Sequence, residues 1–325
     1  MKKTLTLGLF LLCTAGVWLA VFLFRPFLSY PEPAHFSCLD PEAGIMKPLQ
    51  EPHRVFGLGL SYAGHIAESP GLYDPEAGPP IFRKRARSVN RSDRIPYPSR
   101  EDLLEAAGRI DAGHAGELDR RLEELPALLD YEVEIGLVVL EDFAPEALSD
   151  SRFVPPLGYF VANDITARML IGMAPEFAET VSYLAEGKSL SGFLPVGDRA
   201  FIPSHPAPDS WVCVDMVTEV NGEIRQRSSS RDIIYSPREI LRAVALSQDV
   251  KNFQVDDWII TGTPPGVALQ TPGWMQRGLL LVDPSAEVKV SAMAAGSQSA
   301  GFLQPGDQVR VSAGFLGEKI SRIGN

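Results

Sequence analysis

Asp130-Tyr-Glu-Val-Glu-Ile-Gly-Leu-Val-Val-Leu140 is a stretch that begins acidic and ends in a continuous apolar run. Short apolar runs rich in Val and Ile are typical of buried β-strands. Because successive side chains of a strand point to opposite faces, Glu132 and Glu134 point the same way, while Val133 and Ile135 point into packing. The stretch therefore predicts two carboxylates side by side at the edge of a core.

Two carboxylates on one face of a strand repel each other, and near a core they are costly unless a positive group lies between them. A hard divalent cation such as Mg²⁺, Mn²⁺ or Ca²⁺ prefers oxygen ligands and would satisfy both. The alternative is a solvated strand face, which is the commoner case for an isolated pair of this kind. Further residues are needed to choose between these two readings.

Composition limits the classes of function. The chain has 325 residues, 45% of them hydrophobic and 22% charged, which suits one large globular domain or two smaller ones with a sizeable core. The net charge of −11 argues against nucleic acid as a partner and against charge-driven docking on anionic lipid. The three cysteines, Cys13, Cys38 and Cys213, have no metal-binding or redox spacing. A Cys38–Cys213 disulfide is compatible with a location outside the cytoplasm, but the sequence does not require it.

The N-terminus has the pattern of a membrane anchor. Met1-Lys-Lys3 precedes an uncharged run, Thr4–Phe24, whose length matches the roughly 20 residues of a transmembrane helix. The run exceeds the apolar core of a signal peptide and no clear cleavage site follows, which favours an uncleaved anchor. The preceding lysines predict a single-pass topology with the rest of the chain outside the cytoplasm. We expect an anchor over residues 1–25, a linker and lead-in over 26–53, and a domain over 54–325.

A histidine and a glutamate form the second candidate group. The segment Ala63-Gly-His-Ile-Ala-Glu68 follows a predicted strand, and in a helical turn His65 and Glu68 lie on one face and can pair. A carboxylate that holds a histidine fixes its tautomer and raises its basicity, as a general base requires. The alternative is an ordinary surface pair.

A third carboxylate, Asp164, ends a predicted strand over 158–164 and could complete a set with Glu132 and Glu134, or could cap a helix that begins at Ile165. Lys188 follows Gly187 in a predicted loop, where a lysine is usually solvated.

The remaining pattern is rich in short strands and Gly/Pro turns. Asn221-Gly222 between two strand-like runs is a strong hairpin signal. Four leucines at helical spacing predict a packing helix within 101–129, and they are Leu118, Leu122, Leu125 and Leu129. We also expect a helix over 237–247, a strand from Asp257, and short strands near 278–283, 286–292 and 307–313. The pattern predicts an α+β, β-rich domain.

Taken together, these motifs resemble the fumarylacetoacetate hydrolase family. The resemblance extends over residues 54–325, in the family's order, and is more specific than any single motif. The matching stretches are Gly57–Glu68, Asp130–Glu134, Asn163–Arg168, Lys188, Val220–Gln226, Thr261–Val267 and Phe302–Asp307.

The resemblance implies a mixed β-sandwich roll that is usually dimeric and holds Mg²⁺ or Mn²⁺, with Ca²⁺ in some members. It implies a metal-dependent hydrolase that cleaves a carbon–carbon bond in a 2,4-dioxo acid, an acylpyruvate-like small molecule. Oxaloacetate-type decarboxylation and isomerisation are alternatives on the same fold. By motif match, the implied metal ligands are Glu132, Glu134 and Asp164, the catalytic residues are His65, Glu68 and Lys188, and the substrate contacts are Arg168 and Thr263.

The chain departs from the family pattern near the expected pocket. Met169 and Ile171 stand where the family often has Asp and Gln, and Leu190 stands where it has Phe in a Lys-x-Phe-Asp segment. These changes predict an altered, more apolar pocket. They leave open a second reading, a non-catalytic protein that keeps the metal and binds oxo acids, although the His65–Glu68 pair favours an enzyme.

Overall fold

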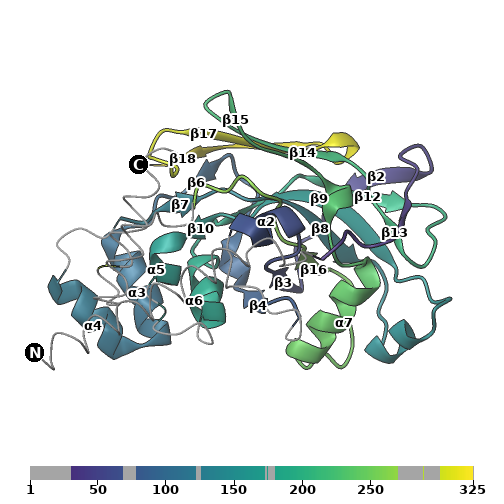
Figure 1. The fold of residues 1–325 in the computed structure, drawn as a ribbon, viewed down its shortest axis with the longest axis horizontal. Coiled ribbons are helices and arrows are strands. Elements are labelled where there is room, and N and C mark those ends of the chain that lie inside the picture. Colours follow the sequence, from purple (N-terminus) through teal and green to yellow (C-terminus); the bar gives the residue numbers. More distant parts are fainter. Residues whose placement is uncertain are drawn as a thin grey trace, which may run out of the picture. The chain divides into compact units, whose positions relative to one another are not determined.

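The computed structural model describes residues 31–68, 78–121, 126–172, 174, 180–269, 288 and 301–324. Two large β-sheets lie over one another in this part of the chain, with helices gathered below the larger sheet (Figure 1). The seven-stranded sheet is antiparallel except that β16 and β3 run parallel. Its order is β2 (Gly44–Pro48), β12 (Arg199–Pro203), β9 (Leu157–Asn163), β8 (Val133–Val139), β16 (Asp257–Ile260), β3 (Arg54–Leu58) and β4 (Ile81–Lys84).

The five-stranded sheet covers one face of the seven-stranded sheet. Its order is β15 (Glu223–Ser229), β14 (Asp215–Val220), β17 (Gln308–Ala313), β18 (Glu318–Ile323) and β6 (Arg94–Ile95). The turn between β14 and β15 has positive φ at both central residues, 52° at Asn221 and 82° at Gly222, as a two-residue hairpin turn requires. The hairpin predicted from Asn221-Gly222 is therefore confirmed.

Strand β8 is buried along its whole length, which explains its continuous apolar sequence. Val133 and Ile135 join a core cluster that also contains Met216 of β14 and Val311 of β17. On the other face Val138 packs in a second cluster. The alternation expected from the sequence is thus observed, and it places Glu134 on the opposite face from Val133 and Ile135.

The helices agree with the sequence in part. The helix predicted over 237–247 is α7 (Pro237–Ser247). The leucine stripe was a wrong prediction, because the chain forms two helices that are separated at Asp111, and Leu129 lies in a strand. Pro126 disfavours helix in the residue before it, and the carbonyl of Leu129 accepts a bond from the Leu303 amide at 2.8 Å. Leu122 and Leu125 lie outside the described residues. The elements concerned are α3 (Arg100–Ile110), α4 (Ala112–Arg121), β7 (Leu129–Asp130) and β10 (Thr166–Ala167), which pairs with β7.

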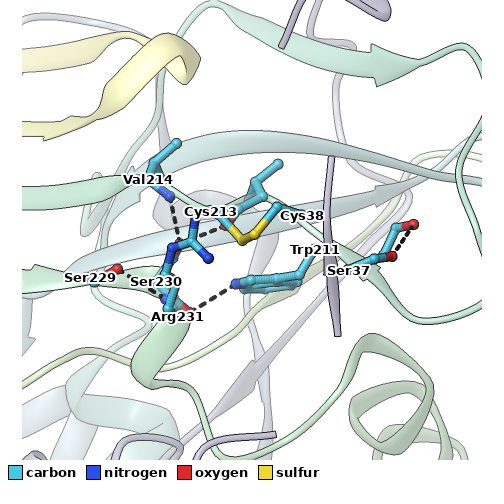
Figure 2. Close-up of a disulfide and its surroundings, with 10 residues drawn as sticks. Ser37, Cys38, Trp211, Cys213, Val214, Ser229, Ser230 and Arg231 are labelled. Atoms are coloured by element: carbon cyan, nitrogen blue, oxygen red, sulfur yellow. Dashed lines mark hydrogen bonds between the residues drawn. A yellow bond between two sulfur atoms is a disulfide. The ribbon is translucent and has the colours of Figure 1, made fainter. Parts of the chain in front are cut away.

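The lead-in before residue 54 is more ordered than predicted. Strand β2 forms an edge of the seven-stranded sheet, and β1 (Ser37–Cys38) pairs in parallel with β13 (Ser210–Trp211). Cys38 and Cys213 form a disulfide with sulfur atoms 2.09 Å apart (Figure 2). The indole of Trp211 beside it donates to the carbonyl of Ser230 at 2.9 Å. These contacts attach the lead-in to the domain.

Two groups of predictions concern parts of the chain that lie outside the described residues. One is the anchor over Thr4–Phe24, and the other is the pair of strands near 278–283 and 286–292, of which only Val288 is described. Within the described ranges no helix combines the length and apolar character needed to cross a membrane.

The disulfide gives a first testable prediction. It closes a loop with a sequence separation of 175, so its loss frees a large part of the unfolded chain. We expect the Cys38→Ser/Cys213→Ser variant to lose about 2–4 kcal/mol of unfolding free energy, measured by urea denaturation of the full chain. Cys13→Ser is the control. Equal denaturation midpoints for the two variants would show that the disulfide contributes nothing to stability.

Candidate active site

The three predicted metal ligands come together at one end of the β8–β9 pair. Glu132 directly precedes β8, Glu134 lies within it, and Asp164 directly follows β9. The antiparallel register pairs Val133 with Asn163, and the Asp164 amide donates to the Glu132 carbonyl at 2.9 Å. One carboxylate oxygen from each of the three residues lies within 4.8 Å of the other two, and all three side chains are buried. The sequence prediction that Asp164 completes the set is consistent with this geometry.

The donor set fits a hard divalent cation. Glu134 Oε2 accepts the Gly262 amide at 2.6 Å, whereas Oε1 is buried and has no hydrogen-bond partner among the described residues. Burial, reinforced by the negative charges of Asp164 and Glu132, raises the pKa of Glu134 well above its ordinary value. A cation bound to the three carboxylates would provide the partner that Oε1 lacks and offset their repulsion.

Two buried lysines balance part of this charge. Lys188 Nζ lies 2.7 Å from Glu132 Oε2 and 2.8 Å from Asp164 Oδ2. Lys84 Nζ donates to Asp164 and to the carbonyl of Lys188. Burial alone would raise the pKa of Glu132, but Lys188 and Arg168 outweigh it and hold that pKa at about 2. Lys188 is therefore not the solvated loop lysine that its sequence context suggests.

Lys84, the last residue of β4, is a residue of the site that the sequence analysis did not select. The alternation of side chains along the strand is the one signal for its burial. It places Lys84 on the opposite face from Arg83, which is exposed. Burial lowers the pKa of Lys84, and the nearby Lys188 ammonium acts in the same direction.

Arg168 orients one of the three candidate metal ligands. Its Nε lies 2.8 Å from Asp130 Oδ2 and its Nη2 lies 2.7 Å from Glu132 Oε1. Asp130 is itself fixed by the amides of Ala268 at 2.7 Å and Leu269 at 3.1 Å. The arginine and this buried aspartate thus orient Glu132, while the contact of Arg168 with substrate stays a prediction.

The predicted dyad lies in α2 (Ala63–Glu68), a helix of less than two turns that follows β3. His65 Nδ1 lies 3.2 Å from Glu68 Oε2, and Glu68 Oε1 accepts the Gly266 amide at 2.8 Å. With Nδ1 held by the carboxylate as a donor, Nε2 carries the lone pair of the neutral ring. His65 contributes to the low pKa of Glu132, so the dyad lies within electrostatic range of the carboxylates.

Thr263 has both of its hydroxyl functions in use. It donates to the Val133 carbonyl at 3.2 Å and accepts from Gln226 Nε2 at 2.9 Å. Gln226 Oε1 in turn accepts the Val133 amide at 3.1 Å and the Thr218 hydroxyl at 2.7 Å. This buried network ties the β14–β15 hairpin to the start of β8. Contact of Thr263 with substrate stays a prediction.

The three apolar departures lie in or beside a core. Met169 and Leu190 are buried in a cluster that also includes Tyr183 and Phe193, and Ile171 is half-buried. They stabilise the helical side of the site by packing, and their effect on the pocket stays a prediction.

The raised pKa of Glu134 predicts how stability depends on pH without metal. The folded state keeps a proton on Glu134 above pH 4.5, its ordinary value, whereas the unfolded chain releases it. Stability therefore falls as pH rises from about 4.5 toward the raised pKa, by at most about 1.4 kcal/mol per pH unit. Glu132, with a pKa of about 2, loses its contribution only below that window.

We expect Glu134→Gln to flatten this slope, measured by urea denaturation at several pH values in the presence of a chelator. A slope that is the same in wild type and variant would place the extra proton elsewhere. Glu141→Gln, a change at an exposed residue, is the control.

Comparison with known proteins places this geometry in a family. The model for the C-terminal domain of fumarylacetoacetate (FAA) hydrolase matches residues 54–324. The chain belongs to the fumarylacetoacetate hydrolase family.

Solved structures of this family share the fold. Fumarylpyruvate hydrolase from Pseudomonas aeruginosa, in complex with Mn²⁺ and pyruvate, has a TM-score of 0.55 and 22% identity, covering 88% of this chain and 97% of that one. Fumarylacetoacetate hydrolase from Exiguobacterium antarcticum has a TM-score of 0.50 and 25% identity, covering 84% and 76%. An uncharacterized protein of Staphylococcus epidermidis is 26% identical over 291 residues, 89% of this chain and 74% of its own length.

Proposed function

We propose that this chain is a divalent-metal-dependent hydrolase that cleaves a carbon–carbon bond in a small 2,4-dioxo acid. The observation that carries the proposal is the His65–Glu68 pair, held at 3.2 Å within electrostatic range of a buried triad of carboxylates. A protein that only bound oxo acids would have no use for a histidine oriented by a carboxylate. The Mn²⁺ and pyruvate named for the Pseudomonas aeruginosa enzyme support the choice of ligand class.

Glu132, Glu134 and Asp164 would hold Mg²⁺ or Mn²⁺, with Ca²⁺ as an alternative. When bound, such a cation supplies Lewis acidity to the 2-oxo acid end of the substrate. Glu68 keeps the Nδ1 proton of His65 in place, so Nε2 is the atom that takes a proton from water.

The hydroxide formed in this way attacks the distal carbonyl carbon. The bond between that carbon and the adjacent methylene then breaks with its electron pair on the methylene carbon. The proton that His65 took returns to this carbon, which gives a carboxylic acid and a 2-oxo acid. Lys188, whose ammonium lies against Glu132 and Asp164, keeps positive charge beside the reacting groups.

Isomerisation is the second candidate reaction. A structurally similar protein from Mycobacterium smegmatis is described as 5-carboxymethyl-2-hydroxymuconate delta-isomerase, with a TM-score of 0.51 and 20% identity over 86% of this chain. The same histidine would then move a proton between carbon atoms, and no water would be consumed. A search for hydrolysis products distinguishes the two reactions.

The proposal is tested with the full chain in mild detergent and Mg²⁺ or Mn²⁺. We expect loss of the enol absorbance of at least one acylpyruvate, with release of pyruvate, and no turnover in the presence of a chelator. Oxaloacetate is included to detect decarboxylation. A folded protein that binds the metal but converts no substrate of the panel would favour the non-catalytic reading.

We also propose that the domain lies outside the cytoplasm, held by the N-terminal apolar segment, and that it forms a homodimer. The Cys38–Cys213 disulfide supports this location, because disulfides persist in oxidising compartments. Labelling of free thiols in intact cells tests it. If Cys38 and Cys213 react with a thiol reagent before reduction, the proposal is wrong.

A further inference from the structure

A basic groove lies apart from the carboxylate site, at the start of β3 and the end of β4. Its volume is about 580 Å³, within the range of small-molecule sites. The antiparallel register pairs Val55 with Lys84 at this end, whereas α2 with His65 follows the other end of β3. The basic and acidic side chains that line the groove are those of His53, Arg54, Arg83, Arg85, Arg87 and Glu186, together with Lys84.

The cations of the groove outnumber the anions that partner them. Arg54 and the half-exposed His53 share Asp257, at 2.8 Å and 3.1 Å, and Arg85 pairs with Glu186. The guanidinium groups of Arg83 and Arg87 remain to be accounted for. Among the residues that the structure describes, Arg83 has no side-chain partner.

Among the described residues the Arg87 side chain has one polar contact, a bond from its Nε to the carbonyl of Ser189 at 3.3 Å. Both side chains are exposed. The groove therefore carries two positive charges without carboxylate partners in a chain whose net charge is −11. Such a local surplus is what an anion-binding site requires, whatever the net charge of the chain.

We propose that this groove binds the phosphate group of a small molecule or of a lipid headgroup. A guanidinium presents its donors as a planar fork that matches a phosphate, and such bonds are strengthened by charge. Two unpartnered guanidinium groups match the two negative charges of a phosphate monoester, whereas a single carboxylate would satisfy only one.

The groove is separate from the carboxylate site although the two share a strand. Side chains alternate along β4, so Arg83 is exposed in the groove while Lys84 is buried with its ammonium against Asp164. A phosphate held by Arg83 and Arg87 therefore lies on the solvent side of this strand. The ligand of the groove is thus distinct from the substrate of the carboxylate site.

The test measures binding of inorganic phosphate and of pyrophosphate to the full chain by titration calorimetry, in chelator and without divalent cations. Dihexanoyl phosphatidic acid, a soluble lipid, is titrated in parallel to identify the source of the phosphate. The test variant is Arg83→Gln/Arg87→Gln. Arg94→Gln is the matched control, because Arg94 is an exposed arginine that does not line the groove.

We expect the double variant to weaken binding about tenfold or more, since it removes hydrogen bonds strengthened by charge, and we expect the control to bind as wild type does. Binding of phosphate or pyrophosphate that depends on Arg83 and Arg87 assigns a free phosphate ligand. Dependence seen with the phosphatidic acid alone assigns a headgroup. Equal binding by the double variant and wild type, or no binding of any probe by a folded wild type, overturns the proposal.

Discussion

Replacing His65 with alanine is expected to lower kcat by about 10²–10⁴-fold while divalent-metal affinity stays unchanged. The expected loss is the usual contribution of a positioned general base. Metal affinity is retained because His65 contributes none of the three carboxylate ligands, and its partner in the structure is Glu68. The measurement combines turnover of the acylpyruvate panel with calorimetric titration of Mn²⁺.

The controls separate chemistry from folding. His205→Ala makes the same change at an exposed histidine and is expected to leave kcat unaltered. Glu68→Gln keeps the size of the partner but removes its charge, and it is expected to give a smaller loss than His65→Ala because the imidazole remains. A His65→Ala variant as active as wild type would remove the dyad from the mechanism and leave the metal site standing.

The sequence predicted the parts of this site that follow from local pattern. Alternation along 130–140 placed Glu132 and Glu134 on one face, and the helical spacing of His65 and Glu68 predicted their contact. Asp164 was identified as a strand terminus, and the antiparallel pairing of β9 with β8 brings it to the two glutamates. The two pairs are set by neighbours within a few residues, whereas Asp164 joins the glutamates through the pairing of two strands.

The role of Lys84 and the carboxylate contacts of Arg168, which were not predicted, depend on contacts between distant segments. Lys84 reaches Asp164 from a strand 80 positions away, and Arg168 reaches Asp130 over 38 positions. The alternation of β4 puts Lys84 on the opposite face from Arg83, but it does not identify Asp164 as the partner of the Lys84 ammonium. The prediction of one leucine-striped helix was wrong for the same reason. The carbonyl of Leu129 accepts a hydrogen bond from the amide of Leu303, which is distant in the sequence. Tertiary pairing there overrides helical spacing.

Replacing Glu134 with alanine is expected to weaken Mn²⁺ binding by about 100-fold or more. Even residues that only orient metal ligands contribute about 10–100-fold, and Glu134 offers a buried oxygen without another partner in the described structure. The same change removes a carboxyl group whose ionisation is disfavoured by burial and by the charges of Asp164 and Glu132, so the metal-free variant is expected to be no less stable than wild type at pH 7, apart from the cavity that it leaves.

Glu134→Ala is thus expected to weaken Mn²⁺ binding without lowering the stability of the metal-free protein, and this combination distinguishes loss of a ligand from loss of structure. Saturating Mn²⁺ should raise the melting temperature of wild type, because the ion binds only the folded state, and should raise that of the variant much less. Glu141→Ala, at an exposed position, should behave as wild type does. A general loss of structure would lower the melting temperature of the variant both with and without Mn²⁺. Loss of a metal ligand would lower only the increase in melting temperature that Mn²⁺ produces. Unchanged Mn²⁺ affinity in a folded Glu134→Ala protein would move the cation away from this triad, and the proposed hydrolase would lose its metal centre while the His65–Glu68 pair remained in place.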